Sequence, residues 1–417
     1  MNFYNSEFLT THSQSIVDFY KDRCVDNDLG GYFQNYLDDG TTFNNGFRQL
    51  VSSTRMVVNF CRAAKLLNND DYLVIAKHGL DYVEQQHWRE SSKAYAWTLQ
   101  DNQPQDMTQQ AYGYAFVLLC YAHCYKAGVI DSDAKISETF ELLESRFWQA
   151  EEGIYADTIY DDGRLCDYRG QNANMHICEA LIAAYGATQS PVYLEKAQHL
   201  ANRFCFELSA QSLGLVYEHF TPELVPDFEY NKDDPKNLYR PWGFQPGHQT
   251  EWAKLLMQLN AFEARPEFVE KAQYLFDVAY SKAWDTFHGG LVYGFDTDYQ
   301  TCDSDKYFWV QAESFAAAAM LFDETKQTQY LEQYSALWDY CWQHFVDHDF
   351  GAWFRVLTGA NQKYSNQKSE AGAKCDYHSL GACFDVLELT FYLLDSILVF
   401  TFWDAGVNFS INLDLTF

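Results

Sequence analysis

One short segment, a small residue followed by aromatic or branched residues, recurs six times along the chain and limits its fold more than any other feature. Successive copies begin 63, 59, 61, 76 and 61 residues apart. Repeats of this length are typical of supersecondary units that stack against one another. The six copies are Gly31-Tyr32-Phe33, Ala94-Tyr95-Ala96-Trp97, Gly153-Ile154-Tyr155, Gly214-Leu215-Val216-Tyr217, Gly290-Leu291-Val292-Tyr293 and Gly351-Ala352-Trp353-Phe354.

The stretches between these segments have a helical apolar period. Ile177, Leu181 and Ala184 share one helix face, and Trp252, Leu255 and Leu259 share another. Each unit therefore holds about two helices. Six antiparallel pairs that bury one face against their neighbours predict an all-α (α/α)6 barrel of six helical hairpins, and an open solenoid is the alternative closure. We expect one catalytic domain over residues 1–417, with 388–417 an atypical C-terminal segment.

Composition excludes several classes of partner. The 417 residues are 47% hydrophobic, enough for one large core, and carry a formal charge of -29. That charge repels phosphate backbones and anionic lipid surfaces, so we expect neither a nucleic acid nor a membrane as partner. The most membrane-like stretch, Leu389 to Trp403, contains Asp395 and is shorter than the roughly twenty residues needed to span a bilayer. We interpret it as a packed terminal helix.

Cysteine usage predicts a reducing compartment. The eleven cysteines are an odd number without a C-x-x-C pair, and Cys120 and Cys124 stand one helical turn apart, as buried thiols do. The first eighteen residues show no basic region followed by an apolar stretch, so no secretion signal is expected. We predict a cytoplasmic protein, either a monomer or a homodimer.

Chemically useful residues recur where the second helix of each unit begins. In a closed barrel these helix ends face one cavity. The set would bring together three imidazoles, a guanidinium, a phenol and two carboxylates. Its members are Arg55, Tyr112, His176, His248 with Glu251, Glu313 and His378.

Such a pocket suits proton transfer next to a carbonyl. Conversion of an aldose to a ketose needs an opened sugar and a base that moves a proton between C2 and C1, and histidine is the natural choice near neutral pH. Arg55 and a second imidazole could stabilise the enediolate oxygens. Glu251 follows His248 by three residues, so the sequence predicts that this carboxylate orients the imidazole. The same spacing could bind a metal, which we keep as a minor alternative.

Four longer motifs resemble the N-acylglucosamine 2-epimerase superfamily, and within it the mannose isomerase and aldose-ketose isomerase branch. They are RGQNANMHICEAL from Arg169, RPWGFQPGHQTEWAKLL from Arg240, WVQAE from Trp309 and DYH from Asp376. The resemblance runs from about Phe8 to Leu387, and the tail beyond departs from it.

The resemblance implies an (α/α)6 barrel acting on free monosaccharides such as D-mannose and D-lyxose, with no metal and no cofactor. It implies His248 and His378 as the catalytic pair. It also implies a set of positions that contact or support the sugar: Arg55, Tyr112, Asn172, His176, Glu251, Trp309 and Glu313.

Other functions remain open on the residues alone. A 2-epimerase acting on N-acylglucosamine or on the reducing end of a disaccharide would use the same two histidines. A glycoside hydrolase would need two catalytic carboxylates, and the acidic pairs such as Asp38-Asp39 lie in turn-like contexts. A binding or scaffold role would leave the converging histidines without a purpose. The proline-bearing stretch from Pro226 to Gly247 is longer than a hairpin turn, and we expect it to help cover the pocket.

Overall fold

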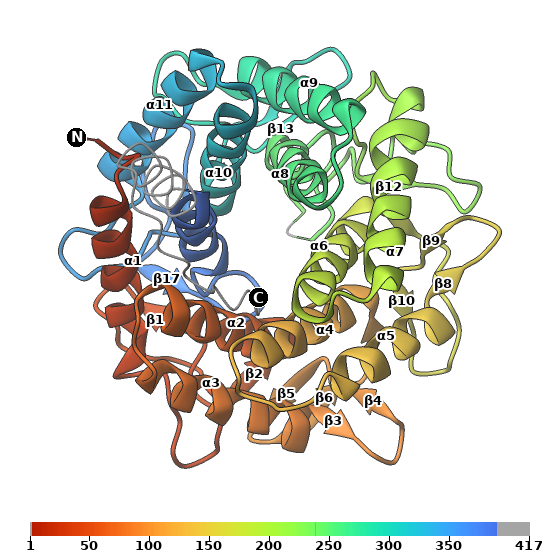
Figure 1. Cartoon of the computed structure of the whole chain (residues 1–417), viewed down its shortest axis with the longest axis vertical. Helices are drawn as coiled ribbons and strands as arrows, with labels where there is room; N and C mark the ends of the chain where they lie inside the picture. Colours follow the sequence, from red (N-terminus) through yellow and green to blue (C-terminus); the bar gives the residue numbers. More distant parts are fainter. Residues whose placement is uncertain (1, 238, 390–417) are drawn as a thin grey trace, which may run out of the picture.

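The computed structural model describes residues 2–237 and 239–389, which form two concentric rings of helices (Figure 1). The outer ring consists of α1 (Ser6–Lys21), α3 (Asp71–Tyr82), α5 (Ala134–Arg146), α7 (Pro191–Asn202), α9 (Pro266–Ala283) and α11 (Thr328–His344). The inner ring consists of α2 (Leu50–Leu66), α4 (Ala111–Lys126), α6 (Gln171–Thr188), α8 (Pro246–Phe262), α10 (Phe308–Thr325) and a last helix over 377–389. The predicted (α/α)6 barrel is confirmed.

The ring is closed, so the solenoid alternative is wrong. In Figure 1 the last helices lie beside the first ones. The Tyr334 hydroxyl of α11 donates to the Phe3 carbonyl oxygen at 2.7 Å, and the Trp353 indole donates to His12 of α1 at 2.8 Å. Hydrogen bonds between the first and the last units thus fix the closure.

Burial separates the two rings. Along α10, the four consecutive alanines 316–319 are all fully buried, because this helix meets neighbours on every side. Along α9, Phe268 and Leu275 are buried while Glu267 and Glu270 are exposed, which is the pattern of a helix with one face in water. The inner ring is therefore the core of the barrel.

The recurring segments join the end of each outer helix to the start of the next inner helix. The turn that opens each segment has a residue in a left-handed conformation, with φ of 67° at Gly31 and 76° at Gly290. In the second unit this residue is Lys93, directly before Ala94, with φ of 52° and no glycine. A Cβ atom at Gly31 would lie 2.7 Å from the Tyr82 ring, and one at Gly290 would lie 2.3 Å from the Tyr340 ring. Glycine is thus required at these two positions by conformation and by space.

Amide side chains on three inner helices fasten these segments in the same way. Each one bonds both the N–H and the carbonyl oxygen of a single segment residue, so that the start of the helix is held at a fixed position. The pairs are Asn174 with Tyr155 (2.8 and 2.9 Å), Gln249 with Val216 (2.9 and 2.7 Å) and Gln311 with Leu291 (2.9 and 2.8 Å).

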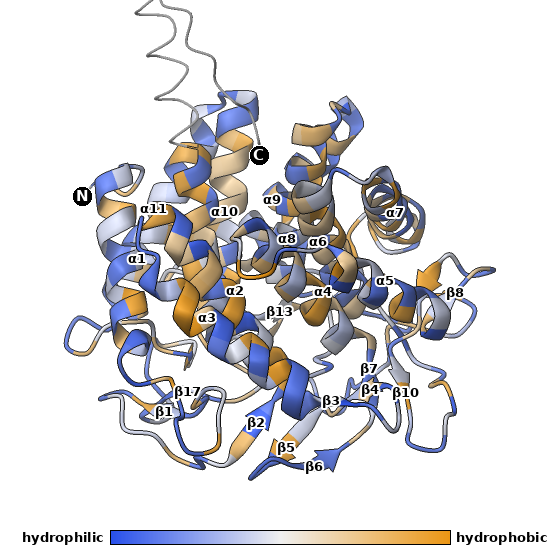
Figure 2. Ribbon diagram, turned by 60° about the horizontal axis from the view of Figure 1, so that its bottom comes forward, coloured by the Kyte–Doolittle hydropathy of each residue, from blue (hydrophilic) through white to orange (hydrophobic). Residues whose placement is uncertain are grey.

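Short antiparallel strands gather at the end of the barrel where the inner helices begin, as Figure 2 shows. Two hairpins hold the segments: β3 (Trp88–Arg89) with β4 (Ala94–Tyr95), and β8 (Trp148–Gln149) with β9 (Ile154–Tyr155). The others are β1 (Tyr36–Leu37) with β17 (Gln367–Ser369), β2 (Phe47–Gln49) with β5 (Thr98–Gln100) and β6 (Gln103–Asp106), β7 (Gln109–Gln110) with β10 (Thr158–Ile159), β11 (Arg169–Gly170) with β12 (His219–Phe220), β13 (Gly294–Phe295) with β14 (Thr301–Asp303), and β15 (Lys306–Tyr307) with β16 (Val356–Leu357).

Three short helical turns extend the outer helices: η1 (Val83–His87), η2 (Arg203–Leu208) and η3 (Ser209–Gln211). Across the described ranges, no helix is both long and apolar enough to cross a bilayer. The packed terminal helix predicted for Leu389 to Trp403 falls, beyond its first residue, outside the described residues. Most of the atypical segment 388–417 falls there too.

Candidate active site

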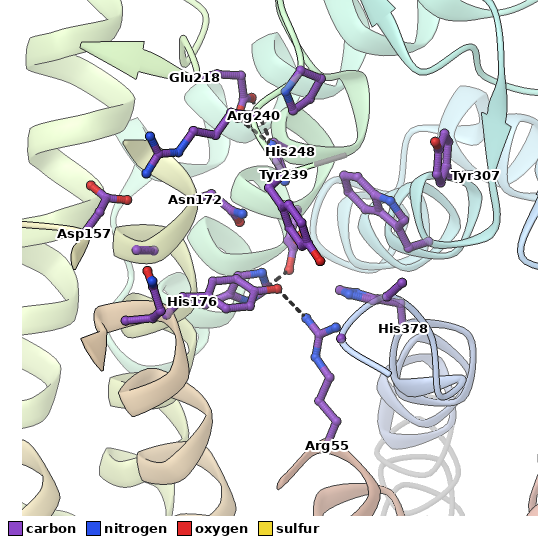
Figure 3. Close-up of a pocket in the computed structure, with 18 of the residues that line it drawn as sticks. Arg55, Asp157, Asn172, His176, Glu218, Tyr239, Arg240, His248, Tyr307 and His378 are labelled. Carbon is purple, nitrogen blue, oxygen red and sulfur yellow. Dashed lines mark hydrogen bonds and ion pairs between the residues drawn. The ribbon is translucent and has the colours of Figure 1, made fainter. Parts of the chain in front are cut away.

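A cavity of about 420 Å³ opens at the end of the barrel where the inner helices begin. Figure 3 shows side chains from several inner helices directed into it. Eight of the nine residues predicted from the sequence line this cavity, and Glu313 lies behind His378. The eight are Arg55, Tyr112, Asn172, His176, His248, Glu251, Trp309 and His378.

His378 belongs to a buried chain of charged groups. Its Nδ1 lies 2.6 Å from Oε1 of Glu313, and the other carboxylate oxygen of Glu313 lies 2.5 Å from Nζ of Lys254. Burial lowers the pKa of His378 well below its usual value, and the positive charge of Arg55 lowers it further. The ring is therefore neutral near pH 7. With Nδ1 engaged by Glu313, Nε2 is the nitrogen that remains for a substrate.

His248 has a different partner from the one predicted. Its Nδ1 lies 2.9 Å from both carboxylate oxygens of Glu218, and the Gln171 amide donates to the same carboxylate at 2.9 Å. The prediction that Glu251 orients His248 is wrong. His248 is in the first turn of α8 and reaches back to the segment that precedes its helix, whereas Glu251 lies beside His176.

Glu218 was not predicted from the sequence, although the repeat contains a signal for it. Glu218 stands four residues after the left-handed residue that opens its segment. In three other units the residue at that position is Trp97, Asp157 or Arg355, and all four line the cavity. In four of the six units this position thus contributes a side chain to the cavity.

Glu251 is buried and makes no hydrogen bond to any described residue. One of its carboxylate oxygens lies 3.7 Å from Nδ1 of His176, and a carboxylate oxygen also lies within 4.8 Å of ligand atoms of Glu313 and His378. Burial raises the pKa of Glu251 well above its usual value, and the Glu313 carboxylate raises it further. A protonated Glu251 can donate a hydrogen bond to a sugar oxygen.

Arg55 supplies the positive charge of the cavity. Its Nη2 donates to the Tyr112 hydroxyl at 2.8 Å, and its guanidinium lies 4.2 Å from the centre of the Phe116 ring. Among the described residues it forms no ion pair, so its charge remains available to an anionic oxygen.

His176 is held by Glu179, a second H-x-x-E pair that the sequence analysis overlooked. Nδ1 of His176 lies 2.9 Å from Oε2 of Glu179, and the Tyr377 hydroxyl donates to Oε1 of Glu179 at 2.7 Å. Burial lowers the pKa of His176. The ring is thus a neutral, fixed member of the cavity wall.

Trp309 and Asn172 complete the wall in complementary ways. The Trp309 ring centre lies 4.9 Å from that of His248 and 5.8 Å from that of His378, so the indole provides an apolar surface between the two histidines. Oδ1 of Asn172 is buried and accepts no hydrogen bond from the described residues, and Figure 3 shows this side chain at the cavity. An apolar wall with a few free polar groups is typical of a site for a small molecule.

The long loop expected near the pocket borders it. Tyr239, Arg240 and Pro241 line the cavity, and α8 begins at Pro246, one residue before Gly247, where the loop predicted from the sequence ends. The Arg240 guanidinium lies 3.7 Å from the centre of the Tyr168 ring. The loop is in position to cover a bound sugar, and its role in closure stays a prediction.

The chain has close relatives. The model of the N-acylglucosamine 2-epimerase (GlcNAc 2-epimerase) family matches residues 31–382. The D-mannose isomerase of Marinomonas mediterranea is 47% identical over 388 residues, covering 93% of this chain and 98% of the relative. A crystal structure of a D-mannose isomerase superposes with a TM-score of 0.91 at 47% identity, covering 93% and 99% of the two chains. The cellobiose 2-epimerase of Spirochaeta thermophila shares the fold, with a TM-score of 0.81 at 21% identity and coverage of 93% and 98%.

Proposed function

This chain belongs to the N-acylglucosamine 2-epimerase family, and we propose that it is an aldose-ketose isomerase that interconverts D-mannose and D-fructose. D-Lyxose and D-xylulose form a second expected pair. The observation that carries the proposal is the pair of histidine-carboxylate contacts, His248 with Glu218 and His378 with Glu313, whose imidazoles share one cavity with Arg55.

The two imidazoles divide the proton transfers of the reaction. Opening a pyranose moves protons at O1 and at the ring oxygen, and we assign this step to His248. Nε2 of His378 then takes the proton from C2 and returns it to C1 on the same face of a cis-enediol. One imidazole cannot easily reach both oxygen and carbon, so two are the minimum.

The enediolate that forms between these transfers is stabilised by fixed groups. Arg55 offers a guanidinium without a carboxylate partner among the described residues, and Glu251 offers a carboxylic acid proton. Donors that are already in place when negative charge develops lower the barrier more than donors that must reorganise. Trp309 places an apolar indole surface between the two histidines.

A 2-epimerase is the second candidate, because cellobiose 2-epimerases share this fold. An epimerase must return the proton to C2 on the opposite face, which requires bases on both sides of the sugar. The isomerase is favoured by the 47% identity to a D-mannose isomerase over nearly the whole chain.

Incubation of the purified protein with D-mannose in deuterated water, followed by NMR, tests the proposal. Fructose carrying deuterium at C1 supports the isomerase, and glucose carrying deuterium at C2 supports the epimerase. An absence of any change with D-mannose, D-lyxose or N-acetylglucosamine contradicts both.

We also propose a reducing, cytoplasmic setting for this enzyme. All eleven cysteines are free thiols and ten of them are buried, which suits a protein that never needs disulfides.

A further inference from the structure

A lysine is buried in the barrel core directly behind the catalytic pair. Lys254 is 4% exposed, and its Nζ lies 2.5 Å from Oε2 of Glu313 and 3.5 Å from Oδ2 of Asp385. Asp385 in turn lies 2.7 Å from Nη2 of Arg62. A continuous chain of alternating charges therefore extends from Glu313, beside His378, down the inside of the barrel.

We infer that Lys254 is a positioning residue: it holds Glu313 ionised, so that Glu313 accepts the Nδ1 proton of His378 and leaves Nε2 unprotonated. This inference rests on the proposed role of His378 as the base that acts on carbon. It assigns a task to a side chain that does not line the cavity.

The ionised state of Glu313 depends on the cation beside it. A buried carboxylate without a cation takes up a proton, and burial indeed raises the pKa of Glu313 while Lys254 opposes the rise. Although burial lowers the pKa of Lys254, Glu313 and Asp385 together raise it above its usual value. Lys254 therefore keeps its charge throughout the pH range of an enzyme assay.

The other charged groups around His378 do not replace Lys254. The cation on α2, Arg55, points to Tyr112 of α4. On α6, the Glu179 carboxylate is engaged by His176. Glu251 on α8 favours its neutral form, and Asp385 on the last helix is shared with Arg62.

Removal of the Lys254 charge has the same result by either of two routes. The pair of Glu313 and His378 would then carry an unbalanced negative charge in the core and would bind one more proton. If the proton goes to the imidazole, both ring nitrogens are protonated. If it goes to Glu313, the acid donates to Nδ1 and the ring proton moves to Nε2. Both routes block Nε2 until the pH is raised.

The test is the pH profile of kcat/KM for Lys254→Met. We expect the acid limb to move upward by about one to three pH units, the usual effect of a neighbouring charge. The matched control is Lys368→Met, which removes another buried lysine, one that lies 2.6 Å from Asp347. Lys368→Met should keep the wild-type position of the acid limb.

Lys254→Met leaves the Glu313 carboxylate without its cation, and a double variant keeps the test possible if this single variant does not fold. Lys254→Met/Glu313→Gln removes both charges and should keep its acid limb near the wild-type pH, with a lower kcat. An upward shift in the double variant equal to that of the single variant, or an unmoved acid limb in folded Lys254→Met, overturns the inference.

A second measurement separates this inference from the proposed function. NMR of protein labelled with ¹⁵N-histidine, with His378 assigned from His378→Asn, reports the imidazole directly. In Lys254→Met the titration of His378 should move upward whether or not His378 is the base. A moved imidazole with an unmoved activity profile supports the Lys254 link and contradicts the role of His378, whereas an unmoved imidazole overturns the role of Lys254.

Discussion

The two histidines of the cavity make the same first contact and differ in what lies behind it. In both, Nδ1 lies against a carboxylate, at 2.9 Å for His248 with Glu218 and 2.6 Å for His378 with Glu313. Glu218 lies between a repeat segment and β12, and its further partner is the neutral amide of Gln171. Glu313 lies on an inner helix, and its further partner is the ammonium group of Lys254.

This difference teaches that one orienting contact can serve two tasks. A carboxylate on Nδ1 fixes the tautomer of either ring and leaves Nε2 toward the substrate. At His378 the positive charge of Lys254 behind the carboxylate also opposes a second proton on the ring. A base that must take a proton from carbon needs an empty Nε2, which the lysine behind Glu313 favours. A group that exchanges protons with sugar oxygens has no such need.

The largest expected effect comes from the histidines themselves. His378→Asn should lower kcat at least about a hundredfold, the low end of general acid/base contributions, and should abolish solvent deuterium exchange at C2. His248→Asn should lower kcat similarly, but should retain some exchange when the substrate is supplied already open.

NMR of D-mannose in deuterated water measures both quantities, and His288→Asn, at an exposed histidine, is the control that should keep wild-type kcat. Exchange that persists in His378→Asn and vanishes in His248→Asn would reverse the assignment. Full activity in either variant would end the two-histidine mechanism.

A smaller effect is expected at the carboxylate that the sequence analysis missed. In Glu218→Gln the amide can donate to Nδ1 of His248. The ring proton then moves to Nε2, so that Nε2 can no longer accept a proton from the substrate. Loss of a hydrogen bond to a charged group costs about 1.5–3 kcal/mol, so kcat should fall about ten- to 150-fold. Steady-state kinetics checks this, with the thermal melting curve to show that the fold is kept. An unchanged kcat would mean that His248 is oriented by other contacts.

The sequence predicted the fold better than it predicted the hydrogen bonds of the site. Helix pairs were visible because the inner helices are apolar and because a left-handed residue such as Gly31 or Gly290 marks each unit. The cavity residues were visible because each lies within the first two turns of an inner helix. These features are local in the chain and occur in every unit, so they could be predicted from the sequence.

The partners of His248 and His378 were harder to predict because they come from other elements. Glu218 precedes His248 by thirty residues and Glu313 precedes His378 by sixty-five. The spacing of three predicted Glu251 as the partner of His248. The actual partner, Glu218, comes from the segment before the helix, which the fold of the chain between them brings back to His248. The same rule would have found Glu179 for His176, which lies on the same helix.

A still smaller effect is expected at the rim, on the side of the loop that leads to His248. Tyr239 is 73% exposed yet lines the cavity, so its ring is available to cover a sugar. Loss of one aromatic contact costs about 0.5–1.5 kcal/mol, and Tyr239→Ala should therefore raise KM about two- to tenfold with little change in kcat. Tyr364→Ala, at a tyrosine that is 58% exposed and outside the cavity, is the control. Equal KM values for both variants would leave the loop without a role in binding.

The smallest expected effect is that of metal removal, which should leave activity unchanged. Two groups of side chains could in principle hold an ion, His176 with Glu179 and Glu251, and Glu251 with Glu313 and His378. In the second group, however, Nδ1 of His378 and the carboxylate oxygens of Glu313 already engage each other and Lys254. An ion there would have to displace a buried lysine from its ion pair or share the site with its charge, and either costs free energy.

Chelation therefore separates two explanations of how the groups around His378 work. In one account the lysine supplies the positive charge behind Glu313 and no ion takes part. In the other a metal ion in the cavity polarises the sugar oxygens. Prolonged dialysis against EDTA followed by assay with D-mannose should give the wild-type rate, and the pH profile should keep its acid limb. A rate that falls on dialysis and returns with manganese or magnesium would place an ion beside Glu251. His378 would then bind that ion or lie next to it. The difference between His378 and His248 would in that case come from the metal ion and not from Lys254.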